Sequence, residues 1–291
     1  MHTVRAKGIL SASNGMNIYR GCQHGCIYCD ARSNCYQMNH KFEDIEVKEN
    51  APELLEYALK RKRRKCMIGT GAMSDPYIPL ESKLKLTRKC LEIIDHYGFG
   101  ATVQTKSSRV MRDIDLFKSI NDKSKAVLQM TLTTVDENLC KIIEPNVSST
   151  KERFETLKAF HEYGIPSVVW FSPFLPFIND TQENIDGLLK YCIDAKVHGI
   201  ICFDIGLTLR DGDREYFYNQ LDKHFPNMKE RYIYTYGNSY QLQSKNSAVL
   251  MRRISDVCKK HGIMFGVDNV FSYLHQFESK TKQLSLFDKI Q

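Results

Sequence analysis

The stretch "GCQHGCIYCDAR", residues Gly21–Arg32, is the starting point for assigning the fold. It places three cysteines, Cys22, Cys26 and Cys29, within eight positions of one short segment. Three soft thiolates at this spacing can wrap a single metal centre. A closed structural zinc site has four ligands, and an ordinary 4Fe-4S cluster likewise takes four cysteines. Either a fourth ligand comes from elsewhere, or one coordination position is left open.

The sequence leaves three interpretations of this cluster. Zinc needs a fourth ligand, for which His24, Cys35 and His40 are candidates. A simple electron-transfer cluster also needs a fourth ligand. A 4Fe-4S cluster with three cysteines instead keeps one iron free, which is the layout required to deliver an electron into a bound molecule.

The composition is that of an ordinary globular protein: 291 residues, 42% hydrophobic and 26% charged, with a formal net charge of +7. No apolar run approaches the roughly 18 residues of a membrane span, and the N-terminal residues lack a long apolar core. We expect a cytoplasmic protein with no membrane partner. The seven other cysteines are scattered, so we expect mostly buried thiols and no disulfide framework.

Apolar strand-like runs alternate with amphipathic helical stretches along nearly the whole chain, which is typical of parallel βα units. Glycines 98, 164 and 262 each end a helical stretch and precede an apolar run. Helix starts are expected at Asn50 or Ala51 and at Asn179 or Asp180. The expected strands are 16–19, 66–69, 101–104, 126–132, 167–171, 199–203 and 264–267, and the expected helices include 52–65, 86–97, 150–163, 181–195 and 247–261.

These elements predict an α/β fold, either a full or partial (β/α) barrel or a doubly wound sheet. No linker or repeat divides the chain. We therefore expect one domain over residues 1–275, followed by a tail over residues 276–291.

The run "CQHGCIYC" resembles the C-x3-C-x-aromatic-C signature of the radical S-adenosylmethionine (SAM) superfamily, through Cys22, Cys26, Tyr28 and Cys29. The resemblance implies a partial (β/α)6-type TIM barrel and a 4Fe-4S cluster held by these three cysteines. SAM would bind the free iron, with Tyr28 against its adenine, and one electron would cleave it to methionine and a 5′-deoxyadenosyl radical. The electron donor would be a protein such as a flavodoxin or ferredoxin.

Other stretches, among them "GTGAMSDPYIPLESKLKLTRKCLEII" and "VQTKSSRVMRDIDL", resemble the branch that contains spore photoproduct lyase and photolyase-like relatives. This resemblance implies DNA as partner and a damaged or modified base as substrate. It also implies SAM contacts from Gly69, Gly71, Ser74, Asp75, Lys106 and Thr131.

Each polar candidate has a structural alternative: Asp75 as a turn former before Pro76, Lys106 as a solvated strand-end lysine, and Thr131 as an ordinary strand residue. Arg153, in the first turn of its helix, either forms an ion pair with Glu144 or reaches the site.

One residue departs from the lyase pattern. Ala72 stands where the lyases have the cysteine that returns a hydrogen atom to the product radical. Lyase activity proper is therefore in doubt, the catalytic residue is unassigned, and Cys35 or Cys202 are the candidate replacements. The alternative functions are radical modification of a protein or small molecule, and a non-enzymatic iron-sulfur or zinc protein.

Two further features concern partners. Gln283, Leu284, Ser285, Leu286 and Phe287 form a pentapeptide that resembles the motif by which bacterial repair proteins bind the DNA sliding clamp. The alternative is that its apolar residues pack on the domain itself. Tyrosines and phenylalanines between residues 216 and 240 offer either a stacking surface for bases or half-buried faces.

Overall fold

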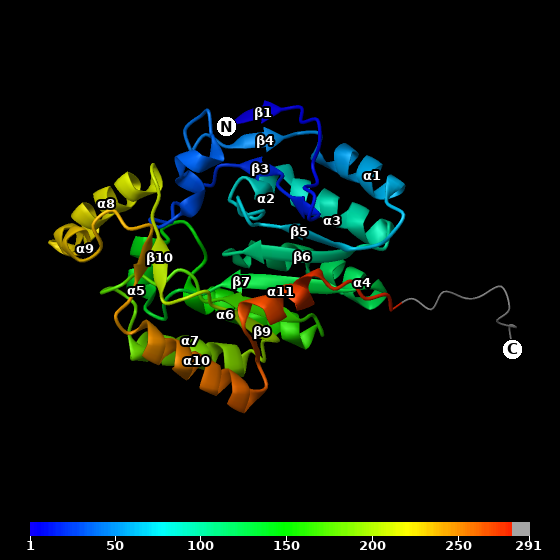
Figure 1. Cartoon of the computed structure of the whole chain (residues 1–291). Coiled ribbons are helices and arrows are strands. Elements are labelled where there is room, and N and C mark those ends of the chain that lie inside the picture. Colours follow the sequence, from blue (N-terminus) through cyan, green and yellow to red (C-terminus); the bar gives the residue numbers. More distant parts are fainter. Residues whose placement is uncertain (281–291) are drawn as a thin grey trace, which may run out of the picture.

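A computed structural model describes residues 1–280 of the chain. Within these residues, seven parallel strands form one open sheet (Figure 1). In spatial order they are β12 (Met264–Phe265), β9 (Gly199–Ile201), β8 (Ser167–Trp170), β7 (Ala126–Thr131), β6 (Gly100–Thr105), β5 (Met67–Thr70) and β2 (Gly15–Met16). The edge strands β12 and β2 do not pair with each other, so the sheet is a partial barrel.

The expected alternation of strands and helices is confirmed, because every strand of this sheet overlaps a predicted one. The α-helices of the described part are α1 (Ala51–Arg61), α2 (Glu81–Leu84), α3 (Leu86–His96), α4 (Ile114–Lys123), α5 (Glu137–Ile143), α6 (Thr150–Glu162), α7 (Gln182–Asp194), α8 (Asp213–His224), α9 (Met228–Tyr236), α10 (Ser247–His261) and α11 (Val267–His275). Short 3-10 helices are η1 (Asp30–Arg32), η2 (Asn34–Tyr36) and η3 (Ser108–Asp113).

Several local signals act as expected. Gly98, Gly164 and Gly262 follow α3, α6 and α10 with φ angles of 64°, 71° and 67°, a conformation that costs little only for glycine. Helix α6 begins with a capping box between Ser149 and Glu152. The predicted cap of α7 was wrong: Thr181 accepts the Asn184 N–H, whereas Asn179 bonds Leu175 and Thr133.

The predicted strand 16–19 is divided between two sheets. Met16 belongs to the main sheet, while β3 (Tyr19–Arg20) pairs with β4 (Glu46–Lys48), which in turn pairs with β1 (His2–Val4). This N-terminal sheet lies beside the main one, at the top of Figure 1. The cysteine segment therefore leaves from the small sheet, because β3 ends one residue before Gly21.

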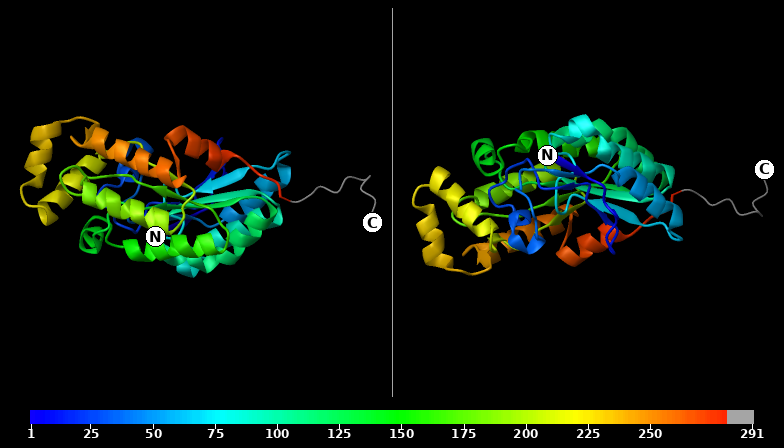
Figure 2. Two further views of the ribbon diagram at one scale, coloured as in Figure 1. Left: turned by 90° about the horizontal axis from the view of Figure 1, so that it is seen from below. Right: turned by 90° about the horizontal axis from the view of Figure 1, so that it is seen from above.

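The main core fills the space between the large sheet and its helices. A second core cluster joins Cys26, Ile27 and Tyr28 to α8, α9 and the antiparallel pair of β10 (Gly206–Thr208) and β11 (Gln241–Gln243). Figure 2 shows α8 and α9 at one end of the elongated molecule. The cysteine segment is thus packed between the barrel and this helical extension.

Within residues 1–280 no helix is long and apolar enough to cross a bilayer. The division into residues 1–275 and a tail stays a prediction, although α11 does end at His275. The clamp-like pentapeptide, Gln283, Leu284, Ser285, Leu286 and Phe287, lies outside the described residues.

Candidate functional site

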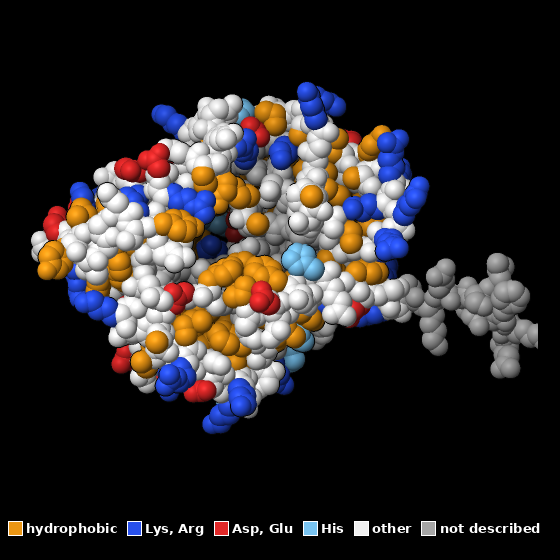
Figure 3. All heavy atoms as spheres, in the orientation of Figure 1, with side chains coloured by type: hydrophobic (Ala, Val, Ile, Leu, Met, Phe, Trp, Pro, Cys, Tyr) orange, Lys and Arg blue, Asp and Glu red, His pale blue; other side chains and the backbone are white. Residues whose placement is uncertain are grey.

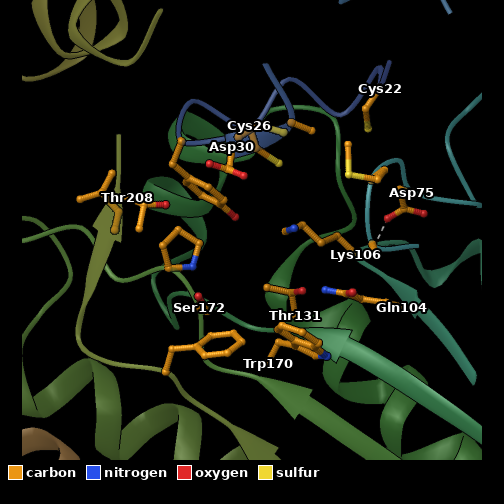
Figure 4. Close-up of a pocket in the computed structure, with 18 of the residues that line it drawn as sticks. Cys22, Cys26, Asp30, Asp75, Gln104, Lys106, Thr131, Trp170, Ser172 and Thr208 are labelled. Atoms are coloured by element: carbon orange, nitrogen blue, oxygen red, sulfur yellow. Dashed lines mark hydrogen bonds between the residues drawn. The ribbon is translucent and has the colours of Figure 1, made fainter. Parts of the chain in front are cut away.

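A cavity of about 560 Å³ opens at the carboxyl ends of the central strands (Figure 4). Cys22, Cys26 and Cys29 line one side of it. The rest is lined by the segment after β5, the ends of β6 and β7, the residues that follow β8 and β9, and the strand pair β10 and β11. Parallel α/β sheets bind their ligands at this position, because the loops that follow the strands converge there. The space-filling view in Figure 3 shows the molecule hollowed on this face.

Contacts from distant segments fix the shape of the cysteine segment. The Ile27 N–H donates to the Ile143 carbonyl at 3.0 Å, and the Asn146 N–H donates to the His24 carbonyl at 3.1 Å. Gly21 has a φ of 87°, and a Cβ there would lie 2.4 Å from the Phe42 carbonyl oxygen, so only glycine fits. The orientation of the three thiols is therefore decided by tertiary contacts.

Burial controls the protonation of these thiols. It raises the pKa of Cys22 to about 12 and raises the pKa values of Cys26 and Cys29 as well. Lys106 opposes the shift at Cys26 and Cys29 through its positive charge. The metal-free thiols therefore hold their protons at neutral pH, and a metal that binds them must displace those protons.

Ser74 and Asp75 connect the segment after β5 to its neighbours. The Ser74 hydroxyl donates to the Gly21 carbonyl at 2.5 Å. Asp75 is buried and accepts hydrogen bonds from the Tyr77 N–H, the Thr105 hydroxyl and the Lys106 N–H, at 2.7 to 2.8 Å. The bond to Tyr77 is the turn-forming contact expected before Pro76. Both residues line the cavity, and their contacts with SAM stay predictions.

Lys106 presents a positive charge to the cavity. Its ammonium makes no hydrogen bond or ion pair with any described residue, and it lies 5.8 Å from the centre of the Tyr28 ring. Burial lowers the pKa of this ammonium, but the carboxylates of Glu144 and Asp75, together with Cys26 and Cys29 in their thiolate forms, outweigh burial and raise it. Figure 4 shows the side chain pointing into the cavity, toward the side that carries Cys26. Lys106 is therefore available to an anionic ligand group.

A buried network holds Tyr28 at the cavity wall. The Tyr28 hydroxyl donates to Glu144, and the other Glu144 oxygen lies 2.6 Å from Arg153 Nη2. Arg153 also donates to the Thr131 carbonyl at 2.8 Å, while the Thr131 side chain lines the cavity. The ion-pair interpretation of Arg153 is thus confirmed. Glu144 does not line this cavity, and nothing local in the sequence indicates its contact with Tyr28.

The two predicted glycines differ in position. Gly71 lines the cavity with a φ of 104°, and a Cβ there would lie 2.0 Å from the Gln104 carbonyl oxygen. Close approach of two protein backbones therefore explains this glycine. Gly69 does not line the cavity and faces the Thr102 methyl group instead.

The cavity contains no thiol apart from the three of the cysteine segment, all ten cysteines being within the described residues. Ala72, the residue that departs from the lyase pattern, lines it. Cys35 is exposed, whereas Cys202 is buried against Met251, and neither reaches the cavity. Five of the seven other cysteines are buried in the core, as expected.

Three aromatic rings besides those of Tyr28 and Tyr36 line the cavity. They are Trp170, Phe203 and Tyr240, of which Phe203 is 55% and Tyr240 45% exposed. The Trp170 indole N–H donates to Gln129 at 2.8 Å, and its ring lies 5.9 Å from that of Phe203. Of the predicted aromatic run, Tyr240 lines the cavity, whereas Phe217 and Tyr232 are fully buried in the second core cluster.

Comparison with known proteins identifies the family. The model of the radical SAM superfamily matches residues 16–191, more than half of the chain, including all three cysteines. The chain belongs to the radical SAM superfamily. Radical SAM proteins use a 4Fe-4S cluster and SAM.

Relatives and solved structures extend this result. An uncharacterized protein of Methanocaldococcus jannaschii is 38% identical over 169 residues, which is 57% of this chain and 62% of that protein. The match thus spans less than two thirds of that relative. The fold resembles a spore photoproduct lyase mutant with dinucleoside spore photoproduct, with a TM-score of 0.66, 14% identity, and coverage of 90% and 80% of the two chains. The fold also resembles Streptococcus suis SuiB bound to SAM, with a TM-score of 0.50 and 13% identity. That match covers 87% of this chain and 49% of SuiB.

The residues present fit the two groups that radical SAM proteins bind. Three thiols face one cavity, which is a suitable donor set for an iron-sulfur cluster with one open position. The same cavity holds a free ammonium at Lys106, which suits a carboxylate such as that of SAM. Neither His40 nor Cys35 lines this cavity, so among the predicted fourth ligands only His24 does.

Proposed function

We propose that this protein is a radical SAM enzyme whose cluster is held by Cys22, Cys26 and Cys29, and whose substrate is a nucleic acid with a damaged or modified base. The observation that carries the proposal is that three thiols and the unpaired ammonium of Lys106 line one cavity, together with the exposed rings of Phe203 and Tyr240. When bound, the cluster supplies the electron that cleaves SAM reductively to methionine and a 5′-deoxyadenosyl radical.

The residues of the chain bind SAM and hold the walls of the cavity in place. Lys106 binds the carboxylate of SAM, and Asp75 fixes the Lys106 backbone through the 2.7 Å hydrogen bond at its N–H. Ser74 joins the segment after β5 to the cysteine segment at Gly21, so that the two walls of the cavity keep their spacing. Tyr28, which lies between Cys26 and Cys29 in the sequence and is held by Glu144, forms part of the cavity wall.

The aromatic side of the cavity supports a base as the reacting group. Phe203 and Tyr240 leave much of their rings exposed at the cavity, and aromatic rings stack on nucleobases with about 1 to 3 kcal/mol per base. Arg210 donates to the Tyr240 hydroxyl at 2.8 Å and holds that ring, while its guanidinium also pairs with Asp30 at 3.6 Å. The formal charge of +7 suits a phosphate backbone, and the fold likeness to spore photoproduct lyase with its dinucleoside lesion agrees with this assignment.

The test of the chemistry is release of 5′-deoxyadenosine. The chain, reconstituted with iron and sulfide without oxygen, is mixed with SAM and dithionite, and the products are separated by chromatography. We expect release from the wild type and from Cys35→Ala, and none from Cys26→Ala. Absence of release from a wild type that carries its cluster and binds SAM would refute the proposal.

The test of the substrate class is nucleic-acid binding at several salt concentrations. Contacts with phosphates predict that the affinity for single-stranded and duplex DNA falls steeply as salt rises. Binding that is absent, or that does not change with salt, would point instead to a protein or small-molecule substrate.

Two partners complete the proposal. A flavodoxin or ferredoxin would supply the electron, and the segment Gln283, Leu284, Ser285, Leu286 and Phe287 would bind the sliding clamp. Phe287→Ala is then expected to lose affinity for the clamp and keep its iron, as measured by surface plasmon resonance and metal analysis. Unchanged affinity would rule out clamp binding through this segment.

A further inference from the structure

A second group of metal-ligating side chains lies in the N-terminal sheet. His2 lies on β1, Glu46 lies on β4, and the two residues are directly paired across the parallel strands. His40 and Asp44 come from the loop that leads into β4. β1 and β4 are at the top of Figure 1, and none of the four residues lines the cavity with the cysteines.

The spacing of the donor atoms suits one metal ion. Ligand atoms of His2, His40 and Asp44 all lie within 4.8 Å of one another. Glu46 Oε2 lies 3.8 Å from His40 Nε2 and 4.0 Å from His2 Nε2. Two ligands of a tetrahedral zinc ion, each at about 2.1 Å, are about 3.4 Å apart. The two Nε2 atoms are therefore too far from Glu46 Oε2 for hydrogen bonds. Their distances from it are close to the distance between two ligands of one metal ion.

His40 is oriented as metal-binding histidines are. Its side chain is only 10% exposed, and its Nδ1 lies 3.0 Å from the Lys41 carbonyl oxygen. A carbonyl can only accept, so Nδ1 carries the proton. The other nitrogen, Nε2, is buried and has no hydrogen-bond partner among residues 1–280. An imidazole that donates one N–H to a backbone carbonyl and keeps the other nitrogen free is the usual arrangement around bound metals.

The charges of the group also favour a cation. Two carboxylates, Asp44 and Glu46, lie beside two imidazoles. Within the described part of the chain, the one ammonium or guanidinium group in an ion pair with them is the Met1 amino group, 2.9 Å from Asp44 Oδ1. Both Asp44 oxygens are bonded, Oδ1 to the Met1 amino group and Oδ2 to His2 Nδ1, each at 2.9 Å, so a metal ion bound by Asp44 would take the place of one of these two contacts.

We propose that His2, His40, Asp44 and Glu46 bind one divalent transition-metal ion, and that zinc is the ion that this donor set fits best. This site is separate from the cysteine site and goes beyond the function proposed above. The metal would join β1 to the loop before β4, and so stabilise the small sheet from which β3 enters the cysteine segment.

The test is zinc binding by the reconstituted protein, prepared with no residues added before Met1 and no polyhistidine tag. Cluster reconstitution first occupies the cysteines. Elemental analysis after gel filtration is expected to give one zinc per chain besides the cluster iron, and competition with a chelator gives its Kd. Loss of an outer-shell partner weakens metal binding about 10- to 100-fold, so loss of a ligand in His2→Ala or His40→Ala should weaken it at least about 100-fold.

His224→Ala is the matched control, because His224 is exposed in the last turn of α8, outside the group. Asp44→Asn is a second, milder variant. Circular dichroism and measurement of the iron content show whether each variant folds. Cobalt in place of zinc should show no thiolate-to-metal absorption. The proposal would be overturned by a holoprotein that binds no zinc, or by folded His2→Ala and His40→Ala variants that bind zinc as tightly as the wild type. A cobalt-thiolate absorption band would also overturn it.

Discussion

Arg153 Nη2 lies 2.6 Å from Glu144 Oε2, and both side chains are fully buried. The pair joins the start of α6 to the end of α5, and through Tyr28 it extends to the cysteine segment. A buried ion pair adds little stability compared with apolar residues, but loss of one partner leaves the other charge unpaired in a low dielectric. We therefore regard this pair as the support of the cavity wall.

Glu144→Gln is expected to destabilise the folded protein by about 3 to 5 kcal/mol, because it leaves the Arg153 guanidinium buried without a counter-charge. Urea unfolding of the metal-free protein measures the change. Glu155→Gln on α6, the helix that carries Arg153, is the control, since Glu155 pairs with Lys158 at the surface and its loss should cost about 1 kcal/mol or less. Equal effects of the two substitutions would contradict the role of the buried pair.

The same pair predicts a pH dependence. Burial alone would raise the pKa of Glu144, but Arg153 and Lys106 outweigh it and hold the pKa below its ordinary value. A depressed carboxyl pKa contributes stability that is present above the unfolded pKa of about 4.3 and is lost as the pH falls through the folded value. The stability difference between wild type and Glu144→Gln should therefore be constant near neutral pH and shrink in acid. A difference that grows in acid would be incompatible with an ionised Glu144.

Lys106→Met should weaken SAM binding by roughly 10-fold or more, since a hydrogen bond to a charged group is worth about 1.5 to 3 kcal/mol. Equilibrium binding of SAM to the reconstituted protein measures the effect. Lys118→Met is the control, because Lys118 is an exposed lysine that pairs with Asp122 on α4. Unchanged SAM affinity in Lys106→Met would identify Lys106 as a solvated lysine, the alternative that the sequence left open.

Phe203→Ala should weaken binding of single-stranded DNA by about 1 to 3 kcal/mol if a base stacks on this ring. Fluorescence anisotropy at fixed salt measures the affinity. Tyr234→Ala removes a ring that is 94% exposed on α9 but does not line the cavity, so it should bind like the wild type. If both variants keep full affinity, the aromatic side of the cavity does not bind bases.

The hydrophobic pattern was sufficient to predict the βα order and the C-terminal glycines of α3, α6 and α10, because these depend on neighbours within a few residues. It failed where pairing is distant. The run 16–19 is shared by two sheets, since β3 pairs with β4 about 27 residues later. The predicted strand 264–267 ends at Phe265, because Gly266 with a φ of 105° turns the chain into α11.

For the site, the sequence by itself determined the three cysteines, since their spacing is local and chemically specific. Tertiary structure alone decided what faces them. Lys106, Thr131 and Phe203 meet at one cavity because parallel strands end at the same edge of the sheet. Glu144 reaches Tyr28 from 116 positions away, and His2 reaches Asp44 from 42 positions away. Such contacts depend on the packing of whole elements, which local periodicity does not encode.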